Sequence, residues 1–308
     1  MPTIYATGTN TVANTGTSGN PYPAVNTSTG AYQFYNRTLL TEMEPKLVHL
    51  QFGDEYRMPE NNGMIMNFRK LVQLDAKTDA LTEGDPGDAQ TLATTEVTVK
   101  LNQYGAYGEF TDLFDMANLD IGLTEKSEEF GRQGGLTIDH VVRSTLLSGI
   151  THTIEDASAT LSSAQIRKAV RDLEKRKAER FDGYYIAIVS PDAIYDLQAD
   201  DAWISAAKYQ DTENVYTGEV GRLFGVRFVV TTEATETNSV KTIIIGRHCY
   251  GYTSWKGAHP RMIIKPAGSA GTADPLDQVS TVGWKMDGFG CAVLQPDYGV
   301  VITTALSA

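Results

Sequence analysis

The chain has little positive charge. Its 308 residues carry 26 Lys and Arg against 38 Asp and Glu, for a formal net charge of −12. A primary nucleic-acid binder needs a basic face, and a membrane-surface protein of the polybasic type needs a basic patch. The balance therefore argues against both classes. Basic residues are concentrated only in 167–180, where acidic neighbours favour a solvated helix face over a phosphate contact.

Cysteine is scarce and long apolar runs are absent. Cys249 and Cys291 are the only two cysteines and lie far apart, so no disulfide framework is expected. No apolar stretch approaches the ~18–20 residues of a membrane-spanning helix. The N-terminus has neither the basic nor the apolar region of a signal peptide. We therefore expect a protein that is made in a cytoplasm and has no membrane association.

Residue patterns for catalysis or metal binding are also missing. No two of the five histidines have the spacing of a helical metal pair, and His248 and Cys249 are expected to face opposite sides of a strand. Glu83 and Asp85 belong to an acidic turn that lacks the twelve-residue calcium loop. The sequence predicts no catalytic residue, cofactor or metal. An α+β enzyme with an unrecognised site is the remote alternative, and it requires a pocket with convergent polar groups.

The first 36 residues contain no charged side chain, and the first one is Arg37. Thr, Asn, Gly, Ser and Pro dominate this segment, which has too little apolar area to offset its own ordering entropy. We expect a neighbouring subunit to hold it through a few anchors, among them Ile4, Tyr5 and Tyr22. A charge-free segment suits such burial, because an unpaired buried charge is costly.

The remaining chain alternates between helical and strand patterns, so the fold class is mixed α+β. Its clearest helix is 162–181, where Ser162 and Gln165 have capping-box spacing. Gly134-Gly135 permit a bend in the long helical region. Residues 53–95 form a two-stranded excursion without a core of its own, which is typical of a partner-bound segment. The other predicted helices are 35–50, 113–147 and 191–198, and the predicted strands are 64–68, 95–110, 184–189, 226–231, 241–245, 262–265 and 300–304.

The order of local motifs is informative. The chain contains, in this order, Leu81-Thr82-Glu83-Gly84-Asp85-Pro86, Gln103-Tyr104-Gly105-Ala106-Tyr107, Ser190-Pro191-Asp192, Gly218-Glu219-Val220-Gly221 and Val282-Gly283-Trp284-Lys285. From about Tyr35 to the C-terminus, this series resembles the major capsid proteins of tailed double-stranded DNA bacteriophages, in a branch common among podophages and prophages.

The resemblance implies the tailed-phage major capsid fold and a structural function. Such proteins self-assemble into hexamers and pentamers of an icosahedral head that encloses double-stranded DNA. The implied location is the virion, after assembly in the host bacterial cytoplasm. The implied partners are other copies of the chain, portal and scaffolding or decoration proteins, and packaged DNA by non-specific proximity. The implied domains are an N-terminal arm with a short helix (1–52), an extended β-hairpin loop (53–100), a peripheral domain with a long spine helix (101–160 plus 266–308) and an axial domain (161–265).

The predicted assembly interface combines the arm with the extended loop. Its residues are Ile4, Tyr5, Tyr22, Arg57, Phe68, Arg69, Lys70, Glu83 and Asp85. An encapsulin-type nanocompartment, which holds protein cargo in place of DNA, is the alternative within the same fold. Some related shells carry Lys–Asn isopeptide crosslinks, but free lysines on a solvated loop are favoured for Lys70 and Lys77.

Overall fold

The computed structural model divides into two compact units. Unit 1 is built on Gln103–Ile138 and Ala258–Asp287, and unit 2 on Val48–Asn102, Asp139–Gly257 and Gly288–Ala308. Helix α3 (Leu123–Gly149) and strand β12 (Val279–Val293) each begin in unit 1 and end in unit 2. The residues described are 42, 47–59, 61–72, 74, 76–78, 80, 83–84, 89–117, 123–156, 158–200, 203, 222–234, 239–256, 259–269 and 274–306.

A six-stranded sheet in the order β5-β13-β9-β6-β8-β7 forms the centre of unit 2. Strand β6 is buried at every position, as its uninterrupted Tyr-Ile-Ala-Ile-Val sequence suggests for a strand covered on both faces. It pairs in parallel with β8 and antiparallel with β9. The bounds are β5 (Thr153–Asp156), β6 (Tyr185–Val189), β7 (Arg222–Leu223), β8 (Val226–Val230), β9 (Ser239–Ile245) and β13 (Gly299–Ala305), with 3-10 turns at Thr232–Ala234 and Pro296–Tyr298.

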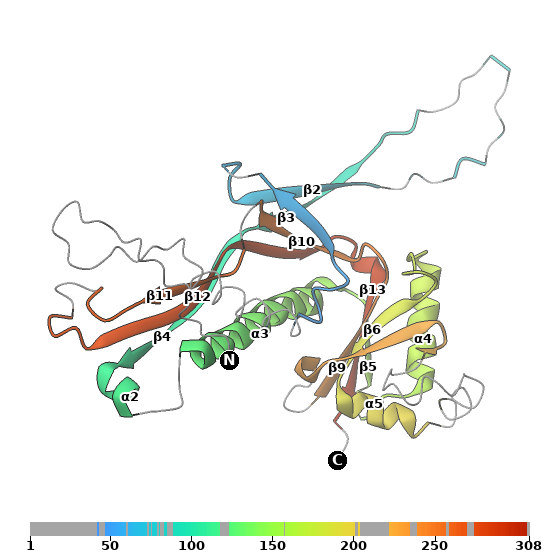
Figure 1. Cartoon of the computed structure of the whole chain (residues 1–308). Helices are drawn as coiled ribbons and strands as arrows, with labels where there is room; N and C mark the ends of the chain where they lie inside the picture. Colours follow the sequence, from blue (N-terminus) through green and yellow to red (C-terminus); the bar gives the residue numbers. More distant parts are fainter. Residues whose placement is uncertain are drawn as a thin grey trace. The chain divides into compact units, whose positions relative to one another are not determined.

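Helices α4 (Ser163–Lys175) and α5 (Pro191–Gln198) lie on one face of this sheet (Figure 1). The amphipathic period of α4 places Ile166 and Leu173 in the core, and α5 contributes Leu197 to the same cluster. The backbone N–H of Ser162 donates to Gln165 Oε1 at 3.0 Å, which confirms the predicted capping contact.

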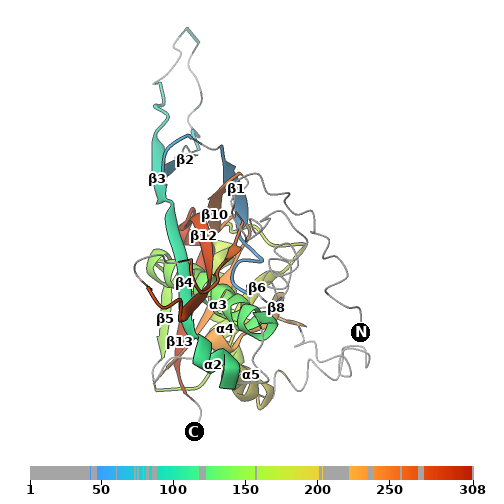
Figure 2. The same cartoon turned by 60° about the vertical axis from the view of Figure 1, so that its left-hand side comes forward.

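A second part of unit 2 holds the excursion. Strand β1 (Asp54–Met58) pairs in parallel with β10 (Tyr250–Trp255), and β10 pairs antiparallel with the last part of β12. Strands β2 (Ile65–Leu71) and β3 (Thr94–Lys100) form a separate antiparallel hairpin, with Phe68 opposite Val97. Figure 2 shows this hairpin beside β1 and β10.

Unit 1 packs the first part of α3 against strands. Strand β12 pairs with β11 (Arg261–Lys265) and with β4 (Asn102–Thr111), which leads into α2 (Asp112–Ala117). Trp284 of β12 is buried, and its indole N–H donates to Gln133 Oε1 on α3 at 3.2 Å. The buried Lys126 places its Nζ 4.1 Å from the centre of the Phe110 ring, a cation–π contact that compensates for lost hydration.

The structure corrects several local predictions. The strand predicted over 95–110 is interrupted at Leu101, which separates β3 from β4. Helix α4 ends at Lys175, before the predicted end at 181, and α3 continues through Gly134-Gly135 as one helix. Strands β10 and β12 were not predicted. Of the helix predicted over 35–50, residues 35–41 and 43–46 lie outside the described residues, and 48–52 form turns.

Candidate assembly surfaces

The β2–β3 hairpin has one anchored face and one open face. On the anchored face, the ring centre of Phe68 lies 4.8 Å from that of Tyr56 on β1, in an edge-on arrangement. On the open face, Arg69 pairs with Glu96 across the hairpin, with Nη2 2.8 Å from Oε1. Both partners are exposed, so this pair adds little to subunit stability. The hairpin is fixed at its root, and its open face stays available to another molecule.

The loop beyond the hairpin exposes apolar side chains. The N–H of Val72 donates to the carbonyl of Ala93 at 2.9 Å, which closes the root of the loop. Every described residue between these two is exposed. Four apolar side chains keep between 43% and 63% of their surface accessible, namely Leu71, Val72, Leu74 and Leu92. Several exposed apolar side chains on one segment are typical of an interaction site.

The structure describes only part of the predicted interface set. Arg57 pairs with Glu55 on β1 at 2.7 Å, and Lys70 Nζ lies 3.4 Å from Gln295 Oε1. Arg57, Phe68, Arg69 and Lys70 therefore belong to the two strands at the root of the loop, while Glu83 is exposed at a turn further out. Ile4, Tyr5, Tyr22 and Asp85 lie outside the described residues. The role of all nine in assembly stays a prediction.

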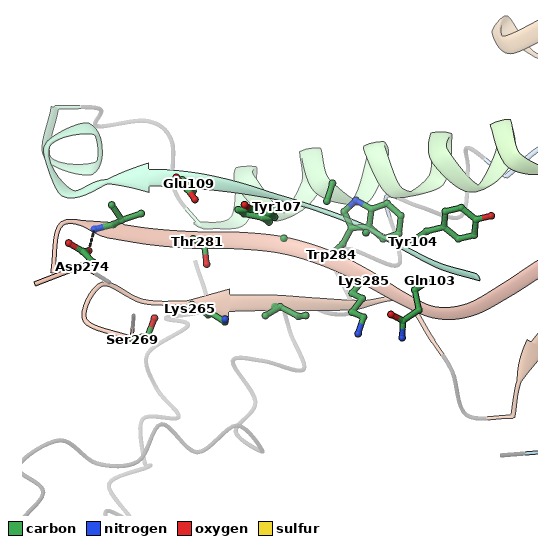
Figure 3. A pocket seen from close by; sticks show the side chains of 15 residues that line it. Gln103, Tyr104, Tyr107, Glu109, Lys265, Ser269, Asp274, Thr281, Trp284 and Lys285 are labelled. Carbon is green, nitrogen blue, oxygen red and sulfur yellow. Dashed lines mark hydrogen bonds between the residues drawn. The ribbon is translucent and has the colours of Figure 1, made fainter. Parts of the chain in front are cut away.

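Unit 1 carries a trough of about 780 Å³ between β4, β11 and β12. Its apolar part includes Ile263 and Tyr107, and the Tyr107 side chain is 72% exposed. In Figure 3, the Trp284 side chain lies on the face of the strands that is toward helix α3. The side chains of Lys285 and Gln103 lie on the opposite face. No sequence pattern indicates this trough, because β12 does not have the alternation of a half-buried strand.

One carboxylate joins the three strands that line the trough. Asp287 accepts from Gln103 Nε2 of β4 at 3.0 Å, and lies 2.9 Å from Lys285 Nζ of β12 and 3.0 Å from Arg261 Nη2 of β11. The side chains surround a single acid with two cations and an amide, which fixes the register of the strands. This arrangement is a structural brace and not a constellation for acid–base chemistry.

Two glycines allow β4 and β12 to approach closely beneath the trough. A Cβ atom on Gly283 would lie 2.5 Å from the carbonyl oxygen of Ala106, and one on Gly105 would lie 2.7 Å from that of Trp284. Backbone atoms cannot yield as a flexible side chain would, so both positions require glycine.

A further apolar group lies at the end of unit 1 where β4 stops and β12 starts. The N–H of Asp112 donates to the carbonyl of Gln278 at 2.9 Å, which joins α2 to the turn before β12. Leu113, Met116 and Leu276 are each at least 74% exposed. The helix predicted over 113–147 includes Leu113 and Met116, and no sequence signal indicates that they are exposed.

A buried polar clamp holds the segment that leads from the arm into β1. Asp139 of α3 accepts from the backbone N–H of His49 at 2.7 Å, and its other oxygen lies 2.6 Å from His49 Nδ1. Both side chains have no exposed surface. The Tyr250 hydroxyl donates to the carbonyl of His49. Three contacts to one residue fix the root of the arm.

The described residues contain no group of three or more His, Cys, Asp or Glu arranged to hold a metal ion. Burial raises the pKa of Cys249 and of Cys291 to about 12, so both thiols stay protonated at neutral pH. His248 lies in a turn with φ of 60°, which corrects the expectation that it and Cys249 occupy one strand. Within the described part of the chain, no helix is long and apolar enough to cross a membrane.

Comparison with solved structures shows which fold these surfaces belong to. The capsid of Cyanophage Pam1 matches with a TM-score of 0.63 and 12% identity, over 97% of this chain and 98% of that chain. A structure from Mycobacterium phage Che8 matches with a TM-score of 0.65 and 16% identity, over 83% and 90%. A virus-like particle from Pyrococcus furiosus matches with a TM-score of 0.56 and 13% identity, over 89% and 100%. At such identities the likeness shows the fold, and the predicted tailed-phage major capsid fold is confirmed.

The family follows from sequence. A family model described as phage capsid protein matches residues 94–302, which is more than half of the chain, and the chain belongs to that family. It is a structural major capsid protein of phage heads, as the motif order predicted. The nanocompartment and enzyme alternatives are not favoured. No curated protein matches the chain.

Proposed function

We propose that this chain assembles into the hexamers and pentamers of an icosahedral head that encloses double-stranded DNA. In this proposal the arm (1–52) and the extended loop (53–100) lie across neighbouring subunits. The peripheral domain comprises 101–160 plus 266–308, and the axial domain comprises 161–265. The observation that carries the proposal is the loop itself, whose apolar side chains are exposed although its root is firmly held.

The trough of unit 1 supplies a surface that suits the loop of another copy. Its exposed Tyr107 and Ile263 offer apolar area to the loop leucines, at roughly 25 cal/mol per Å² buried. Ordering the loop costs about 1–2 kcal/mol per residue in backbone entropy. A loop whose two ends are held by β2 and β3 loses less freedom on docking than a free peptide, which favours the contact.

Portal and scaffolding or decoration proteins are further proposed partners, with assembly in the host bacterial cytoplasm. Packaged DNA is a neighbour by non-specific proximity. The net charge of −12 supports this role, because an acidic inner wall does not adhere to DNA.

Substitution of the loop leucines tests the proposal. Leu71→Ser/Leu74→Ser/Leu92→Ser is expected to leave a folded subunit and to lower the yield of closed particles at least tenfold. Sedimentation gives the yield, negative-stain images show closure, and circular dichroism shows folding. Thr78→Ser/Thr91→Ser is the matched control, since both threonines are exposed on the same loop. Full particle yield from the triple variant would contradict the docking of the loop.

Deletion of residues 1–30 tests the arm. We expect a folded subunit that assembles poorly, and stable closed particles from the deleted protein would contradict this role. Particles of the full chain that contain cargo protein and no DNA would favour the nanocompartment instead.

A further inference from the structure

The outer surface of helix α4 carries a row of positive charge. Ile166, Ala169, Val170 and Leu173 face the core, so the opposite surface presents Lys168, Arg171 and Lys175 at helical spacing. Arg171 Nη2 lies 3.1 Å from Asp172 Oδ1. Within the described residues, no carboxylate lies within ion-pair distance of Lys168 or Lys175. We call these three side chains the basic row.

The outer surface of helix α5 has the opposite charge. Tyr195 is 71% exposed, and Asp192 and Asp196 flank it at the spacing of one helical face. Burial, and next the charge of Asp192, raise the pKa of Asp196, so the two acids repel each other within the subunit. A cation from outside would relieve this repulsion. Tyr195, Asp192 and Asp196 form what we call the acidic face.

The two helices are fixed to each other. The N–H of Ser163 donates to Asp200 Oδ2 at 2.9 Å, which joins the start of α4 to the residues after α5. Both helices pack on the same face of the six-stranded sheet (Figure 1). Among the described residues, no ion pair links the basic row to Asp196. One rigid body therefore presents two surfaces of opposite sign.

A ring of identical subunits needs such a pair of surfaces. In a head-to-tail ring, one surface of each copy meets a different surface of the next copy, so the two must be complementary. We propose that the acidic face of α5 docks on the basic row of α4 in the adjacent copy of this chain, around each hexamer and pentamer. The inference rests on the proposed function. The exposed Tyr195 adds a residue type that is enriched in protein interfaces.

Mixed assembly of two charge-reversed variants tests the contact. Lys168→Glu/Lys175→Glu makes both surfaces acidic, and Asp192→Lys/Asp196→Lys makes both basic. Each variant alone is expected to lower the yield of sedimenting particles at least tenfold, because every contact in its rings joins like charges. An equal mixture is expected to recover at least a third of the yield of the unmodified chain, because alternating copies restore opposite charges in sixfold rings. Glu155→Lys, an exposed reversal on β5, is the control and is expected to assemble normally.

The outcomes separate the two claims. Failure of the unmodified chain to form closed particles would overturn the proposed function. If the unmodified chain assembles, but the mixture gives no more than the two variants alone, the α4–α5 contact is wrong. The same holds if either variant assembles fully. Normal shells with reduced DNA content from the α4 variant alone would show that the basic row faces DNA, and would also overturn the contact. Circular dichroism of each variant excludes misfolding, which mixing would not rescue.

Discussion

The six-stranded sheet of unit 2 and the trough of unit 1 differ in how much apolar surface the chain covers by itself. All five residues of β6 are buried, whereas Tyr107 and Ile263 beside the trough stay exposed. The hairpin loop resembles the trough in this respect, since its leucines find no cover within the described chain. The sheet is complete in one subunit. In the proposed shell, another copy of the chain covers the trough and the loop.

This difference separates stability from assembly. Substitutions in the covered regions are expected to lower the free energy of unfolding of the isolated subunit. Substitutions on the uncovered surfaces are expected to leave that free energy nearly unchanged and to act on particle yield. Four substitutions test this separation.

Asp139→Asn is expected to have the largest effect on the subunit. The change alters the buried carboxyl group that holds His49 through two contacts, and each buried polar group left without its partner costs about 1–3 kcal/mol. Urea unfolding of the unassembled subunit measures it. Asp182→Asn, on an exposed residue, is the control. A loss below about 1 kcal/mol would show that the clamp is not essential.

Gly283→Ala places a Cβ atom against the backbone of β4. The strands must separate, and overpacking of this kind costs about 1–3 kcal/mol in unfolding free energy. Thr281→Ala on the same strand is the control, because it adds no atom. Since Gly283 also lines the trough, particle yield is expected to fall with stability. An unchanged unfolding free energy would show that β4 can shift enough to accept the added Cβ atom.

The buried thiol of Cys249 and the half-buried thiol of Cys291 predict a lower unfolding free energy at alkaline pH. Burial keeps Cys249 and Cys291 protonated in the folded chain up to a pKa of about 12, while in the unfolded chain they ionise near their ordinary pKa. The unfolded state therefore binds fewer protons between these values, so the unfolding free energy is highest below the ordinary pKa and falls as the pH rises. The expected slope is about 1.4 kcal/mol per pH unit for each thiol. Cys291→Ala is expected to remove the contribution of one thiol to the slope of unfolding free energy against pH, between about pH 9 and 11. An unchanged slope would contradict the raised pKa of Cys291.

Arg69→Ala is expected to have the smallest effect on the subunit. The exposed pair with Glu96 contributes at most about 1 kcal/mol to the unfolding free energy. Because Arg69 belongs to the predicted assembly interface, the same change is expected to lower particle yield several-fold. If the unfolding free energy and the particle yield both change little, Arg69 does not belong to the interface. A large loss of unfolding free energy would contradict the separation of stability from assembly.

Those elements of the fold that are determined by residues close together in the chain could be predicted from the sequence. Ser162 and Gln165, three residues apart, predict the start of α4, and the apolar run at 184–189 predicts the strand β6. Strand β12 escaped prediction because Gly283 interrupts its pattern. That glycine is explained only by the carbonyl of Ala106, far away in the sequence.

The candidate surfaces follow the same division. The exposed loop was predicted, because turn signals and the lack of a core are visible in the sequence itself. The trough and the exposed group at Leu113, Met116 and Leu276 were not predicted, since each is formed by segments that are distant along the chain. His49 also gave no signal, because its partner Asp139 lies on a helix 90 positions later.

The clamp on His49 has a consequence for how a shell keeps its subunits. It fixes the root of the arm, and the β2–β3 hairpin fixes the root of the loop, so one folded body carries both segments. In the proposed shell, a subunit bound through one segment holds the other at a high effective concentration near its site. Neither contact then needs to be strong by itself, so a misplaced subunit that is held by one segment can leave during growth. A subunit held by both is lost only when both release together, which makes escape from a closed shell slow.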